Sequence, residues 1–116
     1  MGYSLVVDST TTSDDYSEIN YHFSEGVYGG DYTDVYNGNG SALEPSDYSL
    51  EINANGGTAN EANITSLSTL AGGSLSPGEE NIKININYPD TPSGSELVTV
   101  GPASVSSIFN SVGLHY

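Results

Sequence analysis

Residues 81–87 read Asn81-Ile82-Lys83-Ile84-Asn85-Ile86-Asn87, an unbroken alternation of polar and apolar side chains. Side chains of a β-strand point alternately to its two faces, so this stretch predicts a strand that buries three isoleucines and exposes the residues between them. Helix signals are weak throughout the chain, because Ser, Thr, Gly and Asn dominate it and disfavour helix interiors. The sequence therefore predicts an all-β protein.

Other stretches show the same alternation over shorter lengths. Residues 18–23, 48–52 and 96–100 predict three more strands, and residues 3–7 and 64–70 are expected to add two. Turns rich in Gly, Asn and Pro separate these stretches, and short strands spaced in this way are typical of a β-sandwich.

The 116 residues are enough for one domain. We expect a single antiparallel β-sandwich of about seven strands over residues 1–116. The apolar spacing within residues 102–112 favours a short helical turn near the C-terminus. The expected core is Val7, Ile19, Tyr21, Phe23, Leu50, Ile52, Ile82, Ile84, Ile86, Leu97 and Val100.

The charge of the chain is very one-sided. It contains 15 Asp and Glu residues against the single basic residue Lys83, which gives a net charge of −14. Nucleic-acid binding requires a basic surface, and binding to an anionic membrane is disfavoured for the same reason. No apolar run approaches the roughly 20 residues of a spanning helix. We therefore expect neither a nucleic-acid partner nor membrane insertion.

The acidic excess needs a physical remedy, because like charges repel one another in the compact state. Cysteine is absent, so no disulfide supplements the core. Salt can screen the repulsion, Ca²⁺ can neutralise part of it, or a well-spread acidic surface can tolerate it. The strongest candidates for a Ca²⁺ site are carboxylates in and around the loop that follows residue 27, and the alternative is a solvated acidic loop. The candidate ligands are Glu25, Asp31, Asp34 and Asp47.

The same loop, residues 28–40, is rich in tyrosine. Tyr28, Tyr32 and Tyr36 lie near Asn and Asp residues. A tyrosine ring can pack on the face of a sugar while amides and carboxylates bind its hydroxyls. This pattern is compatible with carbohydrate binding, although tyrosine is also an ordinary strand residue.

Catalysis has little support in the sequence. His22 alternates with Tyr21 and Phe23 and is expected to face outward on a strand. Lys83 alternates with two isoleucines and is also expected to face outward. The chain has no G-x-S-x-G nucleophile motif. We therefore expect no enzymatic activity.

An ordered set of phrases resembles a known family. The phrases are FSEGVY (residues 23–28), GSAL followed by SDYSL (residues 40–50), PSGSELVTV (residues 92–100) and PAS..SIFN..G (residues 102–113). Together they resemble the tandem Ig-like repeats of large bacterial surface and adhesin-type proteins. The resemblance implies an Ig-like sandwich that acts outside the cell without catalytic activity. The chain departs from the pattern in the long insert at residues 28–40 and in its tail at residues 110–114.

Three functions are therefore considered. The first is an extracellular or cell-surface Ig-like module of a bacterial protein, which serves as a structural spacer or adhesion repeat stabilised by Ca²⁺. Its partners would be neighbouring repeats or copies of itself. The second is a carbohydrate-binding module that uses the loop at residues 28–40 to bind surface glycans. The third is a self-assembling surface-layer or filament subunit, since exposed strand edges can pair with the next copy.

Overall fold

The computed structural model describes residues 7–12, 17–104 and 107–113, and all statements about the structure refer to these residues. Six strands, one short α-helix and one 3₁₀ turn make up the fold. The strands are β1 (Val7–Thr12), β2 (Glu18–Val27), β3 (Tyr48–Asn53), β4 (Asn63–Ser68), β5 (Glu79–Asn87) and β6 (Leu97–Pro102). The helix α1 covers Tyr32–Tyr36, and the 3₁₀ turn η1 covers Pro45–Asp47. Among these elements there is no helix with the length and apolar character that crossing a membrane requires.

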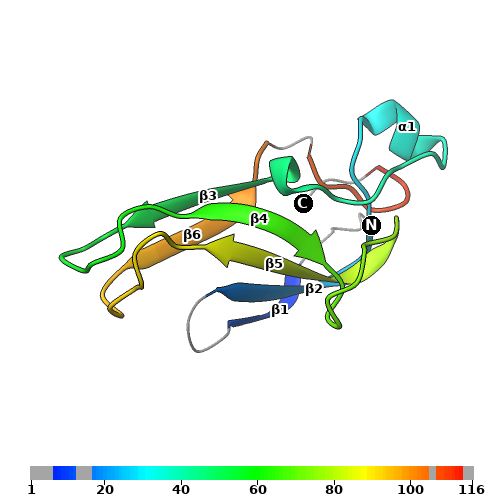
Figure 1. Ribbon diagram of the computed structural model, residues 1–116. Helices are drawn as coiled ribbons and strands as arrows, with labels where there is room; N and C mark the ends of the chain where they lie inside the picture. The colour runs from blue at the N-terminus through cyan, green and yellow to red at the C-terminus, as the bar shows by residue number, and fades with distance from the viewer. Residues whose placement is uncertain (1–6, 13–16, 105–106, 114–116) are drawn as a thin grey trace.

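The strands form two antiparallel sheets that face one another (Figure 1). One sheet has four strands in the order β1-β2-β5-β4, and the other pairs β3 with β6. Immunoglobulin constant-type sandwiches place their strands A, B, E and D in one sheet and C, F and G in the other. Lettered in chain order, β1 to β6 correspond to strands A to F. The order β1-β2-β5-β4 is then A-B-E-D, and the pair β3-β6 is C-F. The expected all-β sandwich is confirmed, with six strands in the described residues.

The isoleucine stretch that predicts the fold lies in β5, inside the four-stranded sheet. Ile82, Ile84 and Ile86 are at most 5% exposed. The register with β2 sets Ile84 opposite Ile19 and Ile82 opposite Tyr21, so apolar side chains of both strands share the inner face. The intervening residues face away from the core, as the alternation predicts.

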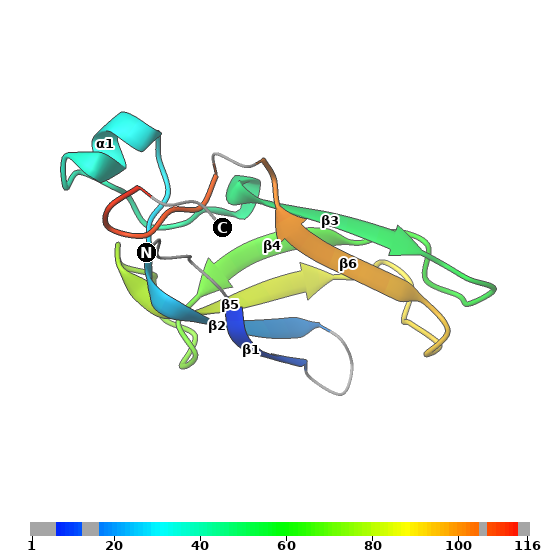
Figure 2. The same cartoon turned by 180° about the vertical axis from the view of Figure 1, so that it is seen from behind.

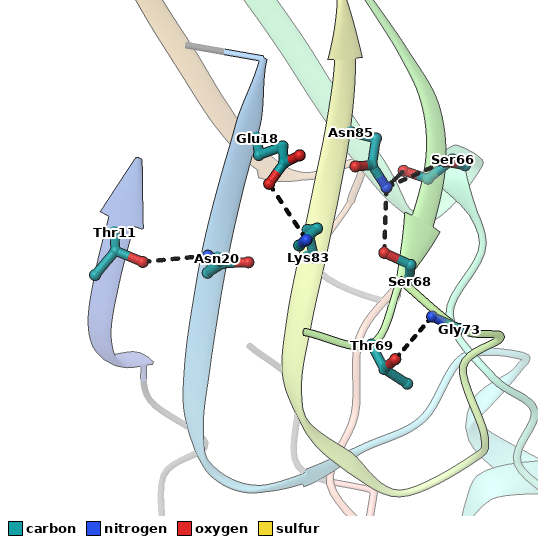
Figure 3. Close-up of polar contacts among 9 residues, drawn as sticks. All are labelled: Thr11, Glu18, Asn20, Ser66, Ser68, Thr69, Gly73, Lys83 and Asn85. Carbon is teal, nitrogen blue, oxygen red and sulfur yellow. Dashed lines mark hydrogen bonds and ion pairs between the residues drawn. The ribbon is translucent and has the colours of Figure 1, made fainter. Parts of the chain in front are cut away.

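The outer face of this sheet is polar (Figure 3). Lys83 places its Nζ 3.2 Å from a carboxylate oxygen of Glu18. Asn85 donates from its side-chain amide to the hydroxyls of Ser66 at 3.1 Å and Ser68 at 3.3 Å. The outward orientation predicted for Lys83 is therefore confirmed.

The core fills the space between the two sheets. Phe23 is completely buried, and the ring of Tyr21 stacks on that of Tyr48 with centroids 6.0 Å apart. The hydroxyl of Tyr21 then donates to the main-chain oxygen of Val100, at 3.3 Å, which ties β2 to β6. Six of the eleven expected core residues are buried, namely Ile19, Tyr21, Phe23, Ile82, Ile84 and Ile86. Ile52 is half-buried. Leu50 and Val100 are partly buried against the core, and the side chain of Val7 lies outside the described residues.

Leu97 is an error in the expected core, because its side chain is 62% exposed. Leu97 and Val100 lie three residues apart in β6, and residues an odd number apart on a strand point to opposite faces. Both could not face the core together. Val98 and Val100 face inward, whereas Leu97 faces solvent.

The expected helical turn near the C-terminus is also wrong for the described residues of 102–112. Phe109 instead forms a β-bridge with Tyr28, in which each main-chain N–H donates to the other residue's carbonyl, at 2.8 and 3.0 Å. Ile108 and Asn110 have no exposed surface. The apolar residues of this segment are therefore buried by pairing with the end of β2. The α-helix of the fold lies instead at α1, within the stretch expected to be a loop.

At the opposite end of the sandwich, one carboxylate holds two loops together. The Glu96 carboxylate accepts hydrogen bonds from the main-chain N–H groups of Ala59 at 2.7 Å, Gly94 at 2.9 Å and Ser93 at 3.0 Å. A Cβ atom at Gly57 would overlap this carboxylate, so a side chain at this position would displace the carboxylate of Glu96. These hydrogen bonds, that of Ala59 above all, outweigh desolvation and lower the pKa of Glu96 from 4.5 to about 2.

We predict that Glu96 makes the protein sensitive to acid. Its pKa is lower in the folded than in the unfolded state, so its contribution is complete above about pH 4.5 and is lost as the pH falls toward 2. Glu96→Gln should lower the melting temperature at pH 7, and the difference from the wild-type protein should shrink between pH 4.5 and pH 2. Thermal melts over this pH range measure it. Glu61→Gln, at an exposed position, is the matched control, and an equal loss in both variants would contradict the prediction.

Candidate functional site

The segment between β2 and β3 forms one end of the molecule, which we call the α1 pole and define as residues 28–43 with residues 107–113 (Figure 1). α1 begins after Asp31, whose side chain accepts from the main-chain N–H of Asp34 at 2.8 Å. Aspartate is a favoured N-cap because it satisfies a free N–H of the first turn. The helix ends at Tyr36, with Asn37 as its C-cap, and Gly38 follows at φ +83°. The N-cap residue Asp31 and the glycine after the helix, Gly38, both lie in a stretch that the sequence analysis interpreted as a loop.

Two tyrosines of α1 form an exposed aromatic pair. Tyr32 and Tyr36 are four residues apart and therefore lie on the same face of the helix. Their ring centroids are 5.8 Å apart with an angle of 23° between the planes, which is a stacked arrangement. They are 53% and 62% exposed. The edge of this pair is held by Phe109, which meets the Tyr32 ring in a T-shaped contact at 6.2 Å.

Tyr28, the third predicted sugar-binding residue, is not part of this pair. It is half-buried at the end of β2 and is fixed there by its bridge to Phe109. Its ring lies against Gly40, and its hydroxyl lies beside Gly78. The structure thus brings together two of the three predicted tyrosines and uses the third for packing.

The structure does not bring the four predicted Ca²⁺ ligands together into one group. Glu25 accepts from the side-chain amide of the fully buried Asn110 at 3.1 Å, whereas Asp31 and Asp34 share the exposed first turn of α1. Asp47 is the last residue of η1, directly before β3, and accepts from the main-chain N–H of Glu44 at 2.8 Å. Within the described residues, no group of three or more Asp, Glu or His side chains is placed to hold a metal ion.

Asp47 is half-buried. Burial raises its pKa, the hydrogen bond from Glu44 opposes the rise, and the charge of Glu44 adds to it. Its Oδ2 atom lies near Gly29, where a Cβ would come within 2.9 Å. Asp47 therefore packs under the base of the α1 pole.

Asn110 is the residue at this pole that sequence reasoning missed. Its amide nitrogen holds Glu25, and its Oδ1 accepts from the main-chain N–H of Val112 at 3.2 Å. Asn110 joins the C-terminal segment to the end of β2. An asparagine in a Ser-rich tail gives no signal of such a role, because only the folded chain brings it to Glu25.

The histidine of β2 faces outward on the sheet, as its alternation with Tyr21 and Phe23 predicts. The Nε2 of His22 lies 3.8 Å from a carboxylate oxygen of Glu80, and both side chains are on the exposed face of the sheet. A cavity of about 250 Å³ is lined by residues of β2 and β6 and of the loop before β6, and His22 is not among them.

Comparison of the chain with protein-family models, with curated proteins and with solved structures finds no match.

The Ca²⁺ expectation remains a prediction, and α1 offers a sharp test of it. Asn caps a helix as well as Asp does, so Asp31→Asn combined with Asp34→Asn removes two charges and keeps the cap of α1. If this loop binds Ca²⁺, millimolar Ca²⁺ should raise the melting temperature of the wild-type protein by several degrees over EDTA, and the double variant should lose this response.

The melts are compared at matched ionic strength, with Mg²⁺ as the control cation. A melting temperature that follows only the NaCl concentration in both proteins would show that the acidic side chains form a screened surface and bind no Ca²⁺ here.

Proposed function

We propose that this chain is a non-catalytic Ig-like module of an extracellular bacterial surface protein, where it serves as a spacer or adhesion repeat. The observation that carries this proposal is the strand order, β1-β2-β5-β4 facing β3-β6. This order agrees with the fold that the resemblance of the sequence to tandem surface repeats implies. Neighbouring repeats of the same polypeptide would be its natural partners.

The physical character of the molecule agrees with such a role. Its dimensions are 46 × 28 × 21 Å, so it can extend a chain along its long axis. It is held by a core between two sheets, and its sequence contains no cysteine. Its net charge of −14 favours solubility and repels anionic surfaces.

The location is tested on intact cells that produce the protein. We expect an antibody raised against the purified domain to label these cells without permeabilisation, and mild proteolysis of the intact cells to remove the label. The antibody against a cytosolic protein of the same cells is the control for leakage. Labelling that requires permeabilisation would contradict the proposed location.

A second candidate function is favoured by the stacked tyrosines. Tyr32 and Tyr36 present neighbouring aromatic faces at the α1 pole, and the exposed carboxylates of Asp31 and Asp34 lie in the same helical turn. Aromatic faces bind the apolar face of sugar rings, and nearby oxygens bind the hydroxyls. An adhesive module could therefore bind a surface glycan here.

We expect glycan binding to depend on the ring of Tyr36, the more exposed of the two. Loss of one aromatic contact costs about 1 kcal/mol, so Tyr36→Ala should weaken the affinity for a bound glycan roughly fivefold. Tyr36→Phe should keep most of the affinity because it retains the ring. A glycan array identifies the ligand, and titration calorimetry measures the variants.

Leu70→Ala is the control, since Leu70 is also exposed but lies outside the α1 pole. The absence of any glycan ligand, or equal affinity of Tyr36→Ala and the wild-type protein, would count against this second function.

A further inference from the structure

Within the part of the chain that the structure describes, the outer edge of β6 is open. β6 pairs with β3 along one edge, and no strand of residues 7–12, 17–104 or 107–113 pairs with the other. In an immunoglobulin sandwich, a seventh strand occupies this position beside strand F. Figure 2 shows β6 as the outer strand of its sheet, on the side of β1 and β2.

The main-chain groups that face this open edge follow from the register. The N–H of Ala103 donates to the carbonyl of Asp47 at 2.9 Å, in line with the pairing of β3 and β6. Because alternate residues of an antiparallel strand bond to the same neighbour, Val98, Val100 and Pro102 direct their main-chain groups away from β3. Pro102 has no N–H, and proline is accepted at such edges.

A contact from the other sheet supports this assignment. The Val100 carbonyl points away from β3 and accepts the hydroxyl of Tyr21 at 3.3 Å. A carbonyl oxygen has two lone pairs and can accept a second hydrogen bond. The edge therefore offers the N–H groups of Val98 and Val100 as donors and the carbonyls of the same residues as acceptors.

The chain that follows β6 does not return along this edge in the described residues. Residues 107–113 lie at the α1 pole beside the helix (Figure 2). Ile108, Phe109 and Asn110 are at most 3% exposed there. Their burial commits this segment to closing the end of the sandwich.

Apolar surface accompanies the open edge. A cavity of about 250 Å³ is lined by Ile19 of β2, by Leu97 and Val98 at the start of β6, and by four residues of the loop before β6, namely Tyr88, Pro92, Gly94 and Glu96. Leu97 also extends into solvent, with 62% of its surface exposed. An additional strand beside β6 would cover this surface.

The charge distribution favours a second copy of the chain at this edge. β6 carries no charged side chain from Leu97 to Pro102, in a protein with a net charge of −14. Natural edge strands are commonly protected by charged residues, and the neighbouring β3 carries the exposed Glu51. Two strongly acidic copies can approach one another only where no carboxylates oppose, and β6 meets this condition.

We propose that two copies of this chain pair antiparallel through β6, with Thr99 on the two-fold axis. In this register, Val98 and Val100 of one copy exchange main-chain hydrogen bonds with Val100 and Val98 of the other. Thr99 meets the second copy's Thr99, a pair that stabilises antiparallel strands. The two short sheets become one continuous sheet, β3-β6-β6-β3.

The side chains of β6 complement one another in this register. Leu97, on the outer face, lies opposite Gly101 of the second copy. A Cβ atom at Gly101 would meet nothing within 4 Å, so there is room for the leucine. The exposed Leu97 of each copy thus packs over Gly101 of the other copy, so the two-fold axis produces this contact twice.

The pairing has two physical consequences. It is isologous and uses the β6 edge of both copies, so it closes at a dimer. Each copy brings a charge of −14, so salt screens repulsion between copies and strengthens the dimer.

Single cysteines test the register directly, because the natural chain contains none. Thr99→Cys places two thiols opposite one another across the axis, and oxidised glutathione should convert this variant to a covalent dimer about tenfold faster than the controls. The controls are Leu97→Cys and Ser49→Cys. In the proposed register, the two thiols introduced by Leu97→Cys would be offset by four residues, roughly 13 Å, which is beyond the reach of a disulfide.

Light scattering after size exclusion tests the dimer without cross-linking. The wild-type protein should shift from monomer to dimer with rising concentration, and the shift should occur at lower concentration in higher NaCl. Thr99→Lys sets two ammonium groups against each other on the axis and should abolish the dimer. Ser49→Lys, an exposed change of equal charge on β3, should preserve it.

Three results would overturn the proposal. One is a wild-type protein that stays monomeric at millimolar concentration and high salt. Another is a dimer that survives Thr99→Lys. The third is equal cross-linking at positions 97 and 99, which would mean random collision. Circular dichroism of each variant confirms that its fold is intact, as expected for exposed positions.

Discussion

The structure depends on the burial of one row of isoleucines. Ile82, Ile84 and Ile86 face the second sheet from β5, which hydrogen-bonds to β2 on one side and to β4 on the other. A strand with two neighbours has its register fixed twice, and a slip of one residue would turn its isoleucines to water and its Lys and Asn side chains into the core. The registers of β2 and β4 against β5, and with them the inner face of β2, follow from this single constraint.

The two ends of the sandwich are closed by different chemistry. At one end the Glu96 carboxylate gathers main-chain N–H groups from two loops. At the other, apolar burial of Ile108 and Phe109 is combined with the hydrogen bond between Asn110 and Glu25. In both places an acidic side chain serves as an acceptor for a neutral donor. An acidic protein with a single basic side chain can thus use its carboxylates in the fold without partners of opposite charge.

Alternation along the chain is sufficient to predict most strands and most of the core, because it follows directly from the pleat. The prediction fails where an apolar residue is assigned to the core without regard to the face of the strand on which it lies. Leu97 is the example, because its position three residues before Val100 puts it on the other face. The prediction also fails at the α1 pole. The apolar residues 108 and 109 suggest a helix by spacing, but their partner is Tyr28, about 80 residues earlier. The stacking of Tyr32 on Tyr36 could not be predicted, because this stretch was expected to be a loop. Asp31 and Gly38 are nevertheless typical of the two ends of a helix.

The position of Lys83 has a practical consequence. It is the only Lys or Arg in the chain, so trypsin has a single bond to cut. That bond lies in the middle of β5, in a strand paired on both sides. A protease needs an extended, unpaired segment, so cleavage waits for the sheet to open, and its rate reports the population of the opened molecule. The rate at which the two tryptic fragments appear on a gel would therefore report the global stability of this domain.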